Sequence, residues 1–195
     1  MKTFDAFTGS RYQVIFGKDA EKKRKVFENK KERLEMFDFF KKKNKKIEIF
    51  SPMSGEAVNV ETVDDAVFSG KMLGDGVAVI PSTGQVFAPV DGTLVKVFNT
   101  KHAYAISTDD GLELLIHCGI DTVELGGEGF ISYKGSGDTI RKGELIAEMD
   151  LGSIAAKGKD TVTPVVVTNF QDFHRLIAKE GKIEAGELLF SLEKK

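Results

Sequence analysis

From Ile47 to the C-terminus, short apolar runs alternate with glycine, proline and aspartate, and this pattern constrains the fold more than any other feature. The runs, in chain order, are KIEIFSP, EAVNVE, GVAVIPS, GQVFAPV, GTLVKVF, HAYAIST, LELLIHCGI, GELIAEMD, TPVVVTN and GELLFSLE. Short strands bounded by turn residues are typical of antiparallel all-β proteins rather than of β-α-β units. We therefore predict an all-β sandwich or barrel, with short helices at residues 151–157 and 171–179.

Two pairs of segments resemble each other, which indicates an internal repeat. IFSPMSGEAV (residues 49–58) resembles VFAPVDGTLV (residues 86–95), and GDTIRKGELI (residues 137–146) resembles GKIEAGELLF (residues 181–190). Each segment contains apolar runs separated by turn residues, as a hairpin does. We therefore expect a sandwich built from pseudo-duplicated hairpins.

Two of the three histidines belong to one predicted hairpin, in the run HAYAISTDDGLELLIHCG. A turn at residues 108–111 would place His102 opposite His117. Directly opposed Cβ atoms lie roughly 4.5–5.5 Å apart in an antiparallel pair, so the two imidazoles could share one small ligand. In this register the core face carries Ala103, Ala105, Leu114, Ile116 and Cys118, and the opposite face carries His102, Tyr104, Leu115 and His117.

Such a histidine pair supports a limited range of chemistry. A neutral imidazole near pH 7 is a nucleophile toward phosphorus, and a second imidazole can donate a proton to phosphoryl oxygens. The pair could also supply two ligands of a zinc site, although no third ligand is evident. Serine hydrolysis is not indicated, because no G-x-S-x-G motif occurs. Cys118 points away from His117 on a strand, which favours a core position over a Cys–His dyad.

Two other features have simpler interpretations. His174 lies in a predicted amphipathic helix with no reactive group near it, and we expect it on the surface. The APVDG and GDTIRKGEL segments resemble hairpins of biotinyl and lipoyl carrier domains, whose modified lysine lies in an MKM or DKA turn. The nearest match, Lys71 in FSGKMLGDG, lacks that context, which argues against a carrier of this kind.

Length and composition indicate a globular protein with one main domain. A chain of 195 residues with 41% hydrophobic residues is long enough to bury a core. No run of about 18 apolar residues occurs, so we expect no membrane-spanning helix, and the N-terminus lacks the pattern of a secretory signal. The single cysteine, Cys118, excludes an internal disulfide and suits a reducing cytoplasm.

The charge is distributed unevenly along the chain. Residues 1–46 hold 15 Lys and Arg against 7 Asp and Glu, a net charge of +8, whereas residues 47–195 hold 13 against 23, a net charge of −10. The acidic body argues against nucleic-acid binding and favours a basic protein partner. We predict a basic N-terminal extension over residues 1–46, followed by the β-domain over residues 47–195.

Four segments of the body, in collinear order, are similar to one known family. They are SPMSGEAVNVETVDDAVFSGKMLGDGVAVIP, APVDGTLVKVFNTKHAYAIST, GLELLIHCGIDTVELGGEGF and TPVVVTN. Together they resemble the glucose-type enzyme IIA of the bacterial phosphoenolpyruvate-dependent sugar phosphotransferase system over about residues 47–195. The resemblance implies an antiparallel β-sandwich and a phosphotransferase that relays a phosphoryl group through histidine.

The resemblance also implies roles for three residues. The histidine in the position of His117 carries the phosphoryl group on Nε2, receives it from HPr, and passes it to a cysteine in the IIB domain of a membrane permease. The histidine matching His102 assists, chiefly in onward transfer, and the threonine matching Thr100 forms a hydrogen bond to it. This relay requires no cofactor.

A phosphoryl relay needs a shallow apolar site that excludes water without holding the product tightly. We expect a collar of apolar side chains around the histidines, formed by Phe68, Met72, Leu73, Phe98, Tyr104 and Leu115. Asp65 and Asp121 match acidic positions that engage partner arginines in the family. The net charge of the body agrees with a basic partner.

In some bacteria the family also has an inhibitory role, and the resemblance implies that this chain could share it. The unphosphorylated form binds permeases and glycerol kinase, and both histidines, here His102 and His117, can join a partner carboxylate around zinc. A regulatory binding module that acts mainly by stoichiometric inhibition is therefore the alternative to a phosphocarrier.

Residues 1–35 depart from the family, whose members commonly begin with a short amphipathic segment. Residues 36–46 suit such a segment, because Met36, Phe37 and Phe40 share a helical face and five lysines follow within six positions. This pattern fits an anionic membrane surface, and a solvated linker explains it equally well. We expect a cytoplasmic protein, with peripheral binding at the inner membrane face as one role of residues 36–46.

Overall fold

The computed structural model describes residues 46–195, and their secondary structure is mostly β. The strands are β1 (Lys46–Phe50), β2 (Gly55–Asn59), β3 (Asp75–Pro81), β4 (Gln85–Phe87), β5 (Gly92–Val97), β6 (Ala103–Ser107), β7 (Glu113–His117), β8 (Phe130–Ser132), β9 (Thr139–Ile140), β10 (Leu145–Met149), β11 (Thr163–Val167), β12 (Phe173–Ala178), β13 (Gly181–Ile183) and β14 (Leu188–Lys194). Each of the ten predicted apolar runs overlaps one of these strands. The predicted all-β class is confirmed.

The helical segments of the described chain are short. They are the α-helices α2 (Ala66–Ser69) and α3 (Leu151–Ala156) and the 3-10 helices η1 (Val60–Thr62), η2 (Thr122–Leu125) and η3 (Phe170–Asp172). The helix α3 matches the prediction at residues 151–157, but the helix predicted at residues 171–179 is wrong. That segment is η3 followed by strand β12, and a bulge between Phe173 and Arg175 lets Phe173 and Leu176 both contact the core. Their spacing of three residues imitates one face of a helix.

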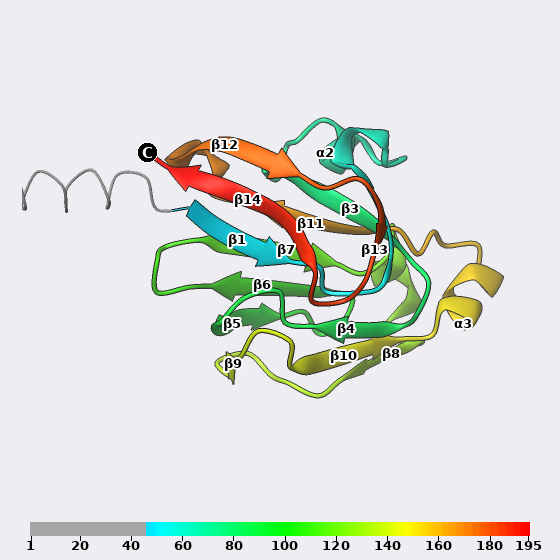
Figure 1. The fold of residues 1–195 in the computed structure, drawn as a ribbon. Coiled ribbons are helices and arrows are strands. Elements are labelled where there is room, and N and C mark those ends of the chain that lie inside the picture. The colour runs from blue at the N-terminus through cyan, green and yellow to red at the C-terminus, as the bar shows by residue number, and fades with distance from the viewer. Residues whose placement is uncertain (1–45) are drawn as a thin grey trace, which may run out of the picture. The chain divides into compact units, whose positions relative to one another are not determined.

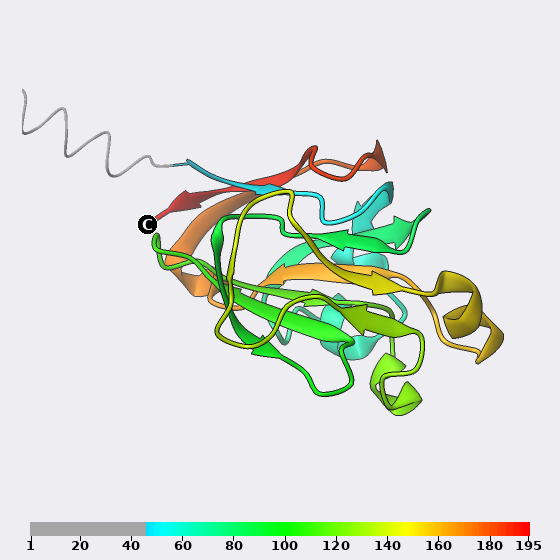
Figure 2. The same cartoon turned by 90° about the horizontal axis from the view of Figure 1, so that it is seen from below.

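The strands form one large sheet and two small sheets (Figure 1). Within residues 46–195, the large sheet has the order β13-β2-β3-β11-β7-β6-β5-β9, and the small sheets have the orders β1-β14-β12 and β4-β10-β8. The small sheets cover one face of the large sheet, so β1 and β14 lie on one side of β6 and β7 while α2 lies on the other (Figures 1 and 2). This arrangement is an antiparallel β-sandwich, as predicted.

The internal repeat is visible in the strand pairing. Strand β1 pairs with β14 and β2 with β13, and in the other half β4 pairs with β10 and β5 with β9. The connecting backbone repeats as well: the Ser51 amide donates to the Glu187 carbonyl at 2.7 Å, and the Ala88 amide donates to the Glu144 carbonyl at 2.8 Å. The pseudo-duplication predicted from the two segment pairs is therefore present in the fold.

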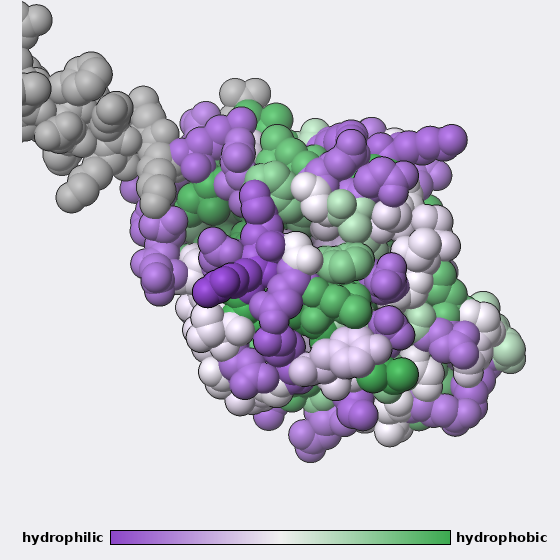
Figure 3. Space-filling model, turned by 60° about the horizontal axis from the view of Figure 1, so that its bottom comes forward, coloured by the Kyte–Doolittle hydropathy of each residue, from purple (hydrophilic) through white to green (hydrophobic). Residues whose placement is uncertain are grey.

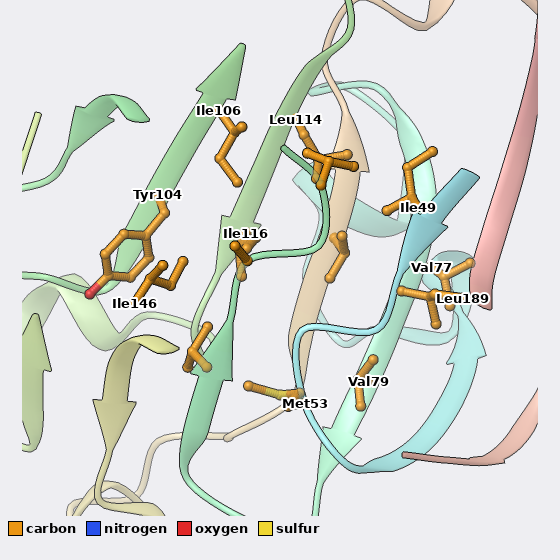
Figure 4. Packing of buried hydrophobic residues seen from close by; sticks show 14 of the residues in the cluster. Ile49, Met53, Val77, Val79, Tyr104, Ile106, Leu114, Ile116, Ile146 and Leu189 are labelled. Atoms are coloured by element: carbon orange, nitrogen blue, oxygen red, sulfur yellow. The ribbon is translucent and has the colours of Figure 1, made fainter. Parts of the chain in front are cut away.

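The main core lies between the large sheet and the small sheets. Figure 4 shows Tyr104 and Ile106 from β6 and Leu114 and Ile116 from β7 pointing into it, and all four side chains are buried. A second, smaller apolar cluster covers the opposite face of the large sheet, and it consists of Val60, Val63, Phe68, Ala78, Ala103, Leu115, Ile120, Val162 and Val166. The large sheet is therefore covered on both faces in its central strands.

The register of the β6–β7 hairpin differs by one residue from the prediction. His117 lies opposite Ala103 instead of His102, and Ser107 lies opposite Glu113. The reason is Leu112, whose side chain is fully buried in the core, so that the loop takes one more residue than predicted. The two faces of β6 are exchanged accordingly: Tyr104 and Ile106 belong to the core, whereas Ala103 and Ala105 lie on the opposite face. In β7 the faces are as predicted, with Leu114 and Ile116 in the core and Leu115 and His117 on the opposite face.

The surface drawn in Figure 3 is mixed, because hydrophilic side chains separate the apolar ones into small areas. Among the described residues no helix is long and apolar enough to cross a membrane. The predicted basic extension lies outside the described residues except for Lys46, and both its proposed membrane contact and the boundary at residue 46 stay predictions.

Candidate functional site

His117 is the last residue of β7, and its half-buried side chain lies on the face of the large sheet that carries the second apolar cluster. Its Nδ1 atom is 2.7 Å from the carbonyl oxygen of Gly119. A carbonyl oxygen can only accept a hydrogen bond, so Nδ1 carries the proton and Nε2 keeps its lone pair. The backbone two residues along the chain therefore selects Nε2 as the nucleophilic atom of His117.

Gly119 can adopt this position only because it lacks a side chain. Its φ is +80°, and a Cβ atom there would lie 2.6 Å from the Asp160 carbonyl oxygen and 2.5 Å from the Thr122 Cγ2 atom. Gly119 was not among the site residues predicted from the sequence. The sequence signal that could have identified it is a glycine two residues after a histidine that ends a strand. A left-handed backbone at such a glycine turns its carbonyl back toward the histidine ring.

The His102 side chain lies on the same face of the large sheet as His117, although the backbone of His102 lies opposite that of Cys118. The Cys118 amide donates to the His102 carbonyl at 2.7 Å, and strand alternation would send the His102 side chain into the core with Cys118. Strand β6 begins only at Ala103, however, and Lys101 has a left-handed φ of +56°. This turn redirects the His102 ring toward His117.

The His102 ring is buried and held by its neighbours. The Thr100 Oγ1 atom lies 2.5 Å from the His102 Nδ1 atom, which places the Thr100 hydroxyl where the resemblance implied. The side chain of His102 is 5% exposed. Because its Nδ1 atom is engaged by Thr100, its Nε2 atom is the one available to a ligand.

The two imidazoles face each other between two phenylalanine rings. The centroids of His102 and His117 are 5.0 Å apart, with an angle of 74° between the ring planes. Phe68 lies 5.1 Å from His117 and Phe98 lies 5.5 Å from His102, centroid to centroid. The predicted proximity of the histidines is therefore correct, although the register by which it was predicted is not.

Burial keeps both histidines neutral near pH 7. Desolvation lowers the pKa of His102 from 6.5 to about 4, with a further contribution from the charge of His117. Desolvation also lowers the pKa of His117, while the Gly119 hydrogen bond and the charges of Asp65 and Asp121 act in the opposite direction. A neutral His117 beside groups that stabilise its cation suits a nucleophile whose ring becomes positively charged during reaction.

The structure places the residues of the predicted collar in different surroundings. Met72 is 74% exposed, and Leu73 and Phe98 are also exposed, whereas Phe68 and Leu115 are buried in the second apolar cluster. Tyr104 is wrong as a collar residue: it is fully buried in the main core on the other side of the sheet. The register shift explains the error, because it exchanges the two faces of β6.

The two acidic residues predicted to bind partner arginines, Asp65 and Asp121, have different local roles. The Asp65 carboxylate caps α2 by accepting from the Val67 and Phe68 amides at 2.8 and 3.1 Å. Asp121 is exposed and precedes η2 with a left-handed φ of +54°. Two exposed apolar side chains in these same elements were not predicted from the sequence, Val67 in α2 and Val123 in η2.

Two imidazole nitrogens are suitable zinc ligands, but they do not complete a site. Within residues 46–195 no group of three or more His, Cys, Asp or Glu side chains is arranged to hold a metal ion. Because zinc sites in proteins have at least three protein ligands, His102 and His117 could bind zinc only with further ligands from a partner. Cys118 is not such a ligand, since it is buried and burial raises the pKa of its thiol to about 12.

Comparison with known proteins gives a consistent result. Residues 47–173 match the model of the phosphoenolpyruvate-dependent sugar phosphotransferase system, EIIA 1. The PTS system glucose-specific EIIA component of Haemophilus influenzae is 44% identical over 78% of this chain and 94% of its own length, and that of Buchnera aphidicola from Acyrthosiphon pisum is 45% identical over 77% and 92%.

A solved structure agrees with these sequence relatives. The glucose permease IIA from Mycoplasma capricolum superposes with a TM-score of 0.73 at 37% identity, covering 76% of this chain and 96% of that one. The sandwich, the facing histidines and the matched segments lead to one conclusion: this chain belongs to the EIIA 1 family of the phosphoenolpyruvate-dependent sugar phosphotransferase system and is a phosphotransfer component of it.

Proposed function

We propose that the chain accepts a phosphoryl group from phosphorylated HPr on Nε2 of His117 and passes it to the IIB domain of a sugar permease. One observation supports this most strongly: the hydrogen bond from His117 Nδ1 to the Gly119 carbonyl oxygen at 2.7 Å, which leaves Nε2 free beside a second imidazole. The glucose-specific names of the relatives favour a glucose permease as the recipient.

In the accepting step, the lone pair on His117 Nε2 attacks phosphorus. A new N–P bond forms, the N–P bond of the donor phosphohistidine breaks, and its electron pair returns to the donor imidazole. The His117 ring keeps its proton on Nδ1 and becomes cationic. The Gly119 carbonyl, Asp65 and Asp121 stabilise that positive charge, as they already favour the cation of the free ring.

In the donating step, the cationic ring is a good leaving group. A cysteine thiolate of the IIB domain attacks phosphorus, an S–P bond forms, and the electron pair of the N–P bond returns to His117 Nε2. We assign His102 to this step: when the Thr100 hydroxyl donates to its Nδ1 atom, its Nε2 carries a proton that can be donated in a hydrogen bond to a phosphoryl oxygen. Thr100 is thus the group that orients His102.

We propose that partners dock on the apolar surface around the histidines, which Phe68, Met72, Leu73, Phe98 and Leu115 help to form. Asp65 and Asp121 would engage arginine side chains at the rim of this surface. The body, with a net charge of −10 over residues 47–195, attracts a basic partner and speeds its approach.

A regulatory function of the unphosphorylated form is the second proposal. The feature that favours it is the exposure of Met72 and Leu73, which gives other permeases or glycerol kinase the same surface to bind. A partner carboxylate could complete a zinc site with His102 and His117. Phosphorylation would oppose both, because it occupies Nε2 of His117 and adds negative charge to an apolar surface.

Phosphorylation by purified components tests the proposed relay. Incubation with phosphoenolpyruvate, enzyme I and HPr should add one phosphoryl group by mass spectrometry, stable in base and labile in acid as expected of a phosphoramidate. Binding of unphosphorylated and phosphorylated chain to purified glycerol kinase, with and without zinc, tests the regulatory proposal. A chain that accepts no phosphoryl group yet binds glycerol kinase would be a regulatory module only.

A further inference from the structure

Lys71 occupies an unusual position between α2 and β3. Its φ of +54° is left-handed, a conformation that residues with a side chain rarely adopt unless their surroundings impose it. Its ammonium group forms ion pairs with Glu61 at 2.6 Å and with Asp75 at 3.1 Å. These carboxylates raise the pKa of Lys71, with the Glu61 hydrogen bond as the largest cause, so the ammonium remains charged.

The ion pairs connect three separate parts of the chain. Glu61 belongs to η1, Asp75 is the first residue of β3, and Lys71 lies in the turn of residues 70–74 that joins α2 to β3. Asp75 is itself fixed, because its Oδ1 atom accepts from the Gly76 amide at 2.8 Å. Lys71 therefore ties the turn to two elements that lie before and after it.

This turn carries exposed apolar side chains of the proposed docking surface. Met72 is 74% exposed and Leu73 is 41% exposed. The backbone of the turn is anchored at both ends. The Met72 amide donates to the Val67 carbonyl at 2.9 Å, and a Cβ atom at Gly74 would meet the Val167 carbonyl oxygen at 2.0 Å.

We propose that Lys71 is a positioning residue for partner docking: its ion pairs to Glu61 and Asp75 hold Met72 and Leu73 where the phosphoryl donor binds. The proposal rests on the proposed function, since it takes phosphorylated HPr as the partner. Lys71 acts through the turn and touches no reacting atom. Its loss should therefore raise KM for the donor and leave kcat unchanged.

The opposite interpretation of Lys71 makes a different prediction. If its charge simply faced a basic partner, removing that charge would weaken repulsion and lower KM. If Lys71 mattered only because its backbone adopts a left-handed φ, Lys71→Gly would behave like the unaltered protein, because glycine adopts positive φ without strain. Under our proposal Lys71→Gly and Lys71→Met both raise KM, and Lys71→Arg restores it.

The experiment measures initial rates of phosphoryl transfer from phosphorylated HPr to the full chain. Lys71→Met should raise KM about three- to tenfold, the range expected for losing two partly exposed ion pairs, with kcat unchanged. Glu61→Gln should raise KM less, and E61Q/K71M should equal K71M. Lys134→Met is the matched control, because Lys134 forms a comparable ion pair with Glu144 at 2.5 Å outside the docking surface.

Amide hydrogen exchange at Met72 and Gly74 gives a readout that does not depend on activity. The Met72 amide donates to the Val67 carbonyl in α2, and the Gly74 amide donates to the Lys71 carbonyl at 3.2 Å. Lys71→Met should speed the exchange of both amides, and Lys134→Met should not. Unchanged exchange, an unchanged or lowered KM, or a fall in kcat alone would overturn the proposal. If the unaltered protein accepts no phosphoryl group, the proposed function and the docking role fall together, and exchange still decides whether Lys71 holds the turn.

Discussion

The Nδ1 atom of His117 lies 2.7 Å from the carbonyl oxygen of Gly119, and this contact fixes the proton on Nδ1. The tautomer is thus imposed by the backbone and does not depend on another titratable group. A phosphoryl group on Nε2 would leave the hydrogen bond intact, and the carbonyl dipole would stabilise the cationic ring.

His102→Gln tests the division of labour between the histidines. Acceptance needs only the lone pair on His117 Nε2, so the variant should still accept a phosphoryl group on His117. Glutamine is longer and more flexible than the His102 ring, so it does not hold a hydrogen-bond donor at the position of the His102 Nε2 atom. Onward transfer to the IIB domain should slow by about 10²-fold or more, the usual cost of removing one positioned hydrogen-bond donor to the transition state. Single-turnover rates in both directions provide the measurement, and equal losses in both would mean that His102 only shapes the site.

The depressed pKa of His102 predicts a loss of stability in mild acid. The unfolded chain takes up the proton near pH 6.5 and the folded chain only near pH 4, so the unfolded state binds more protons between these values. The contribution of neutral His102 to the free energy of unfolding is therefore fully present above pH 6.5, and it is lost as the pH falls toward 4. By pH 5 this histidine should cost the fold about 1–2 kcal/mol.

Urea denaturation at pH 7 and pH 5 measures this effect. His102→Gln should lose less stability between the two pH values than the unaltered protein, because glutamine does not titrate. His117 also has a lowered pKa, so the variant should retain part of the acid sensitivity. An equal loss in both proteins would show that His102 is not buried in its neutral form.

Cys118 should be unreactive in the folded protein. The side chain is 1% exposed in the main core, and burial raises the pKa of its thiol to about 12, so almost no accessible thiolate exists near pH 8. A chromogenic disulfide reagent should modify Cys118 only after urea unfolds the protein. Rapid stoichiometric modification of the native protein would contradict the predicted burial.

A chain that begins at Ile47 should fold and accept a phosphoryl group from HPr as the full chain does, because the described β-sandwich contains both histidines. It should lose the binding to anionic vesicles that we predict for the full chain. Lysines near such a surface contribute about 1 kcal/mol each, and residues 41–46 contain five. Full-length protein that ignores anionic vesicles in a low-salt flotation assay would make residues 36–46 a solvated linker.

Much of the fold could be predicted from the sequence because the strands are short, apolar and bounded by turn residues. The ten predicted runs, the internal repeat and the proximity of the histidines are all present. The register of β6 and β7 was not predictable by alternation alone, since Leu112 enters the core from the loop instead of pairing with Ser107. The same one-residue shift placed Tyr104 on the wrong face.

The site itself depends on backbone conformations that side-chain patterns do not reveal. Lys101 and Asp121 adopt positive φ without being glycine, and the turn at Lys101 brings His102 to the face of His117. The strand β12 was predicted as a helix because a bulge gives Phe173 and Leu176 the spacing of a helical face. Side-chain patterns predict structure where the backbone is regular, whereas the backbone around the two histidines is irregular.

The most direct test of the central claim is to locate the phosphoryl group within the histidine ring. After incubation with phosphoenolpyruvate, enzyme I and HPr, long-range proton–nitrogen NMR of the nitrogen-15-labelled chain identifies which ring nitrogen carries phosphorus. Our account predicts Nε2 of His117, with Nδ1 still protonated, and no phosphorylation of the His117→Ala variant. Phosphorus on Nδ1 of His117, or on His102 or His174, would contradict it.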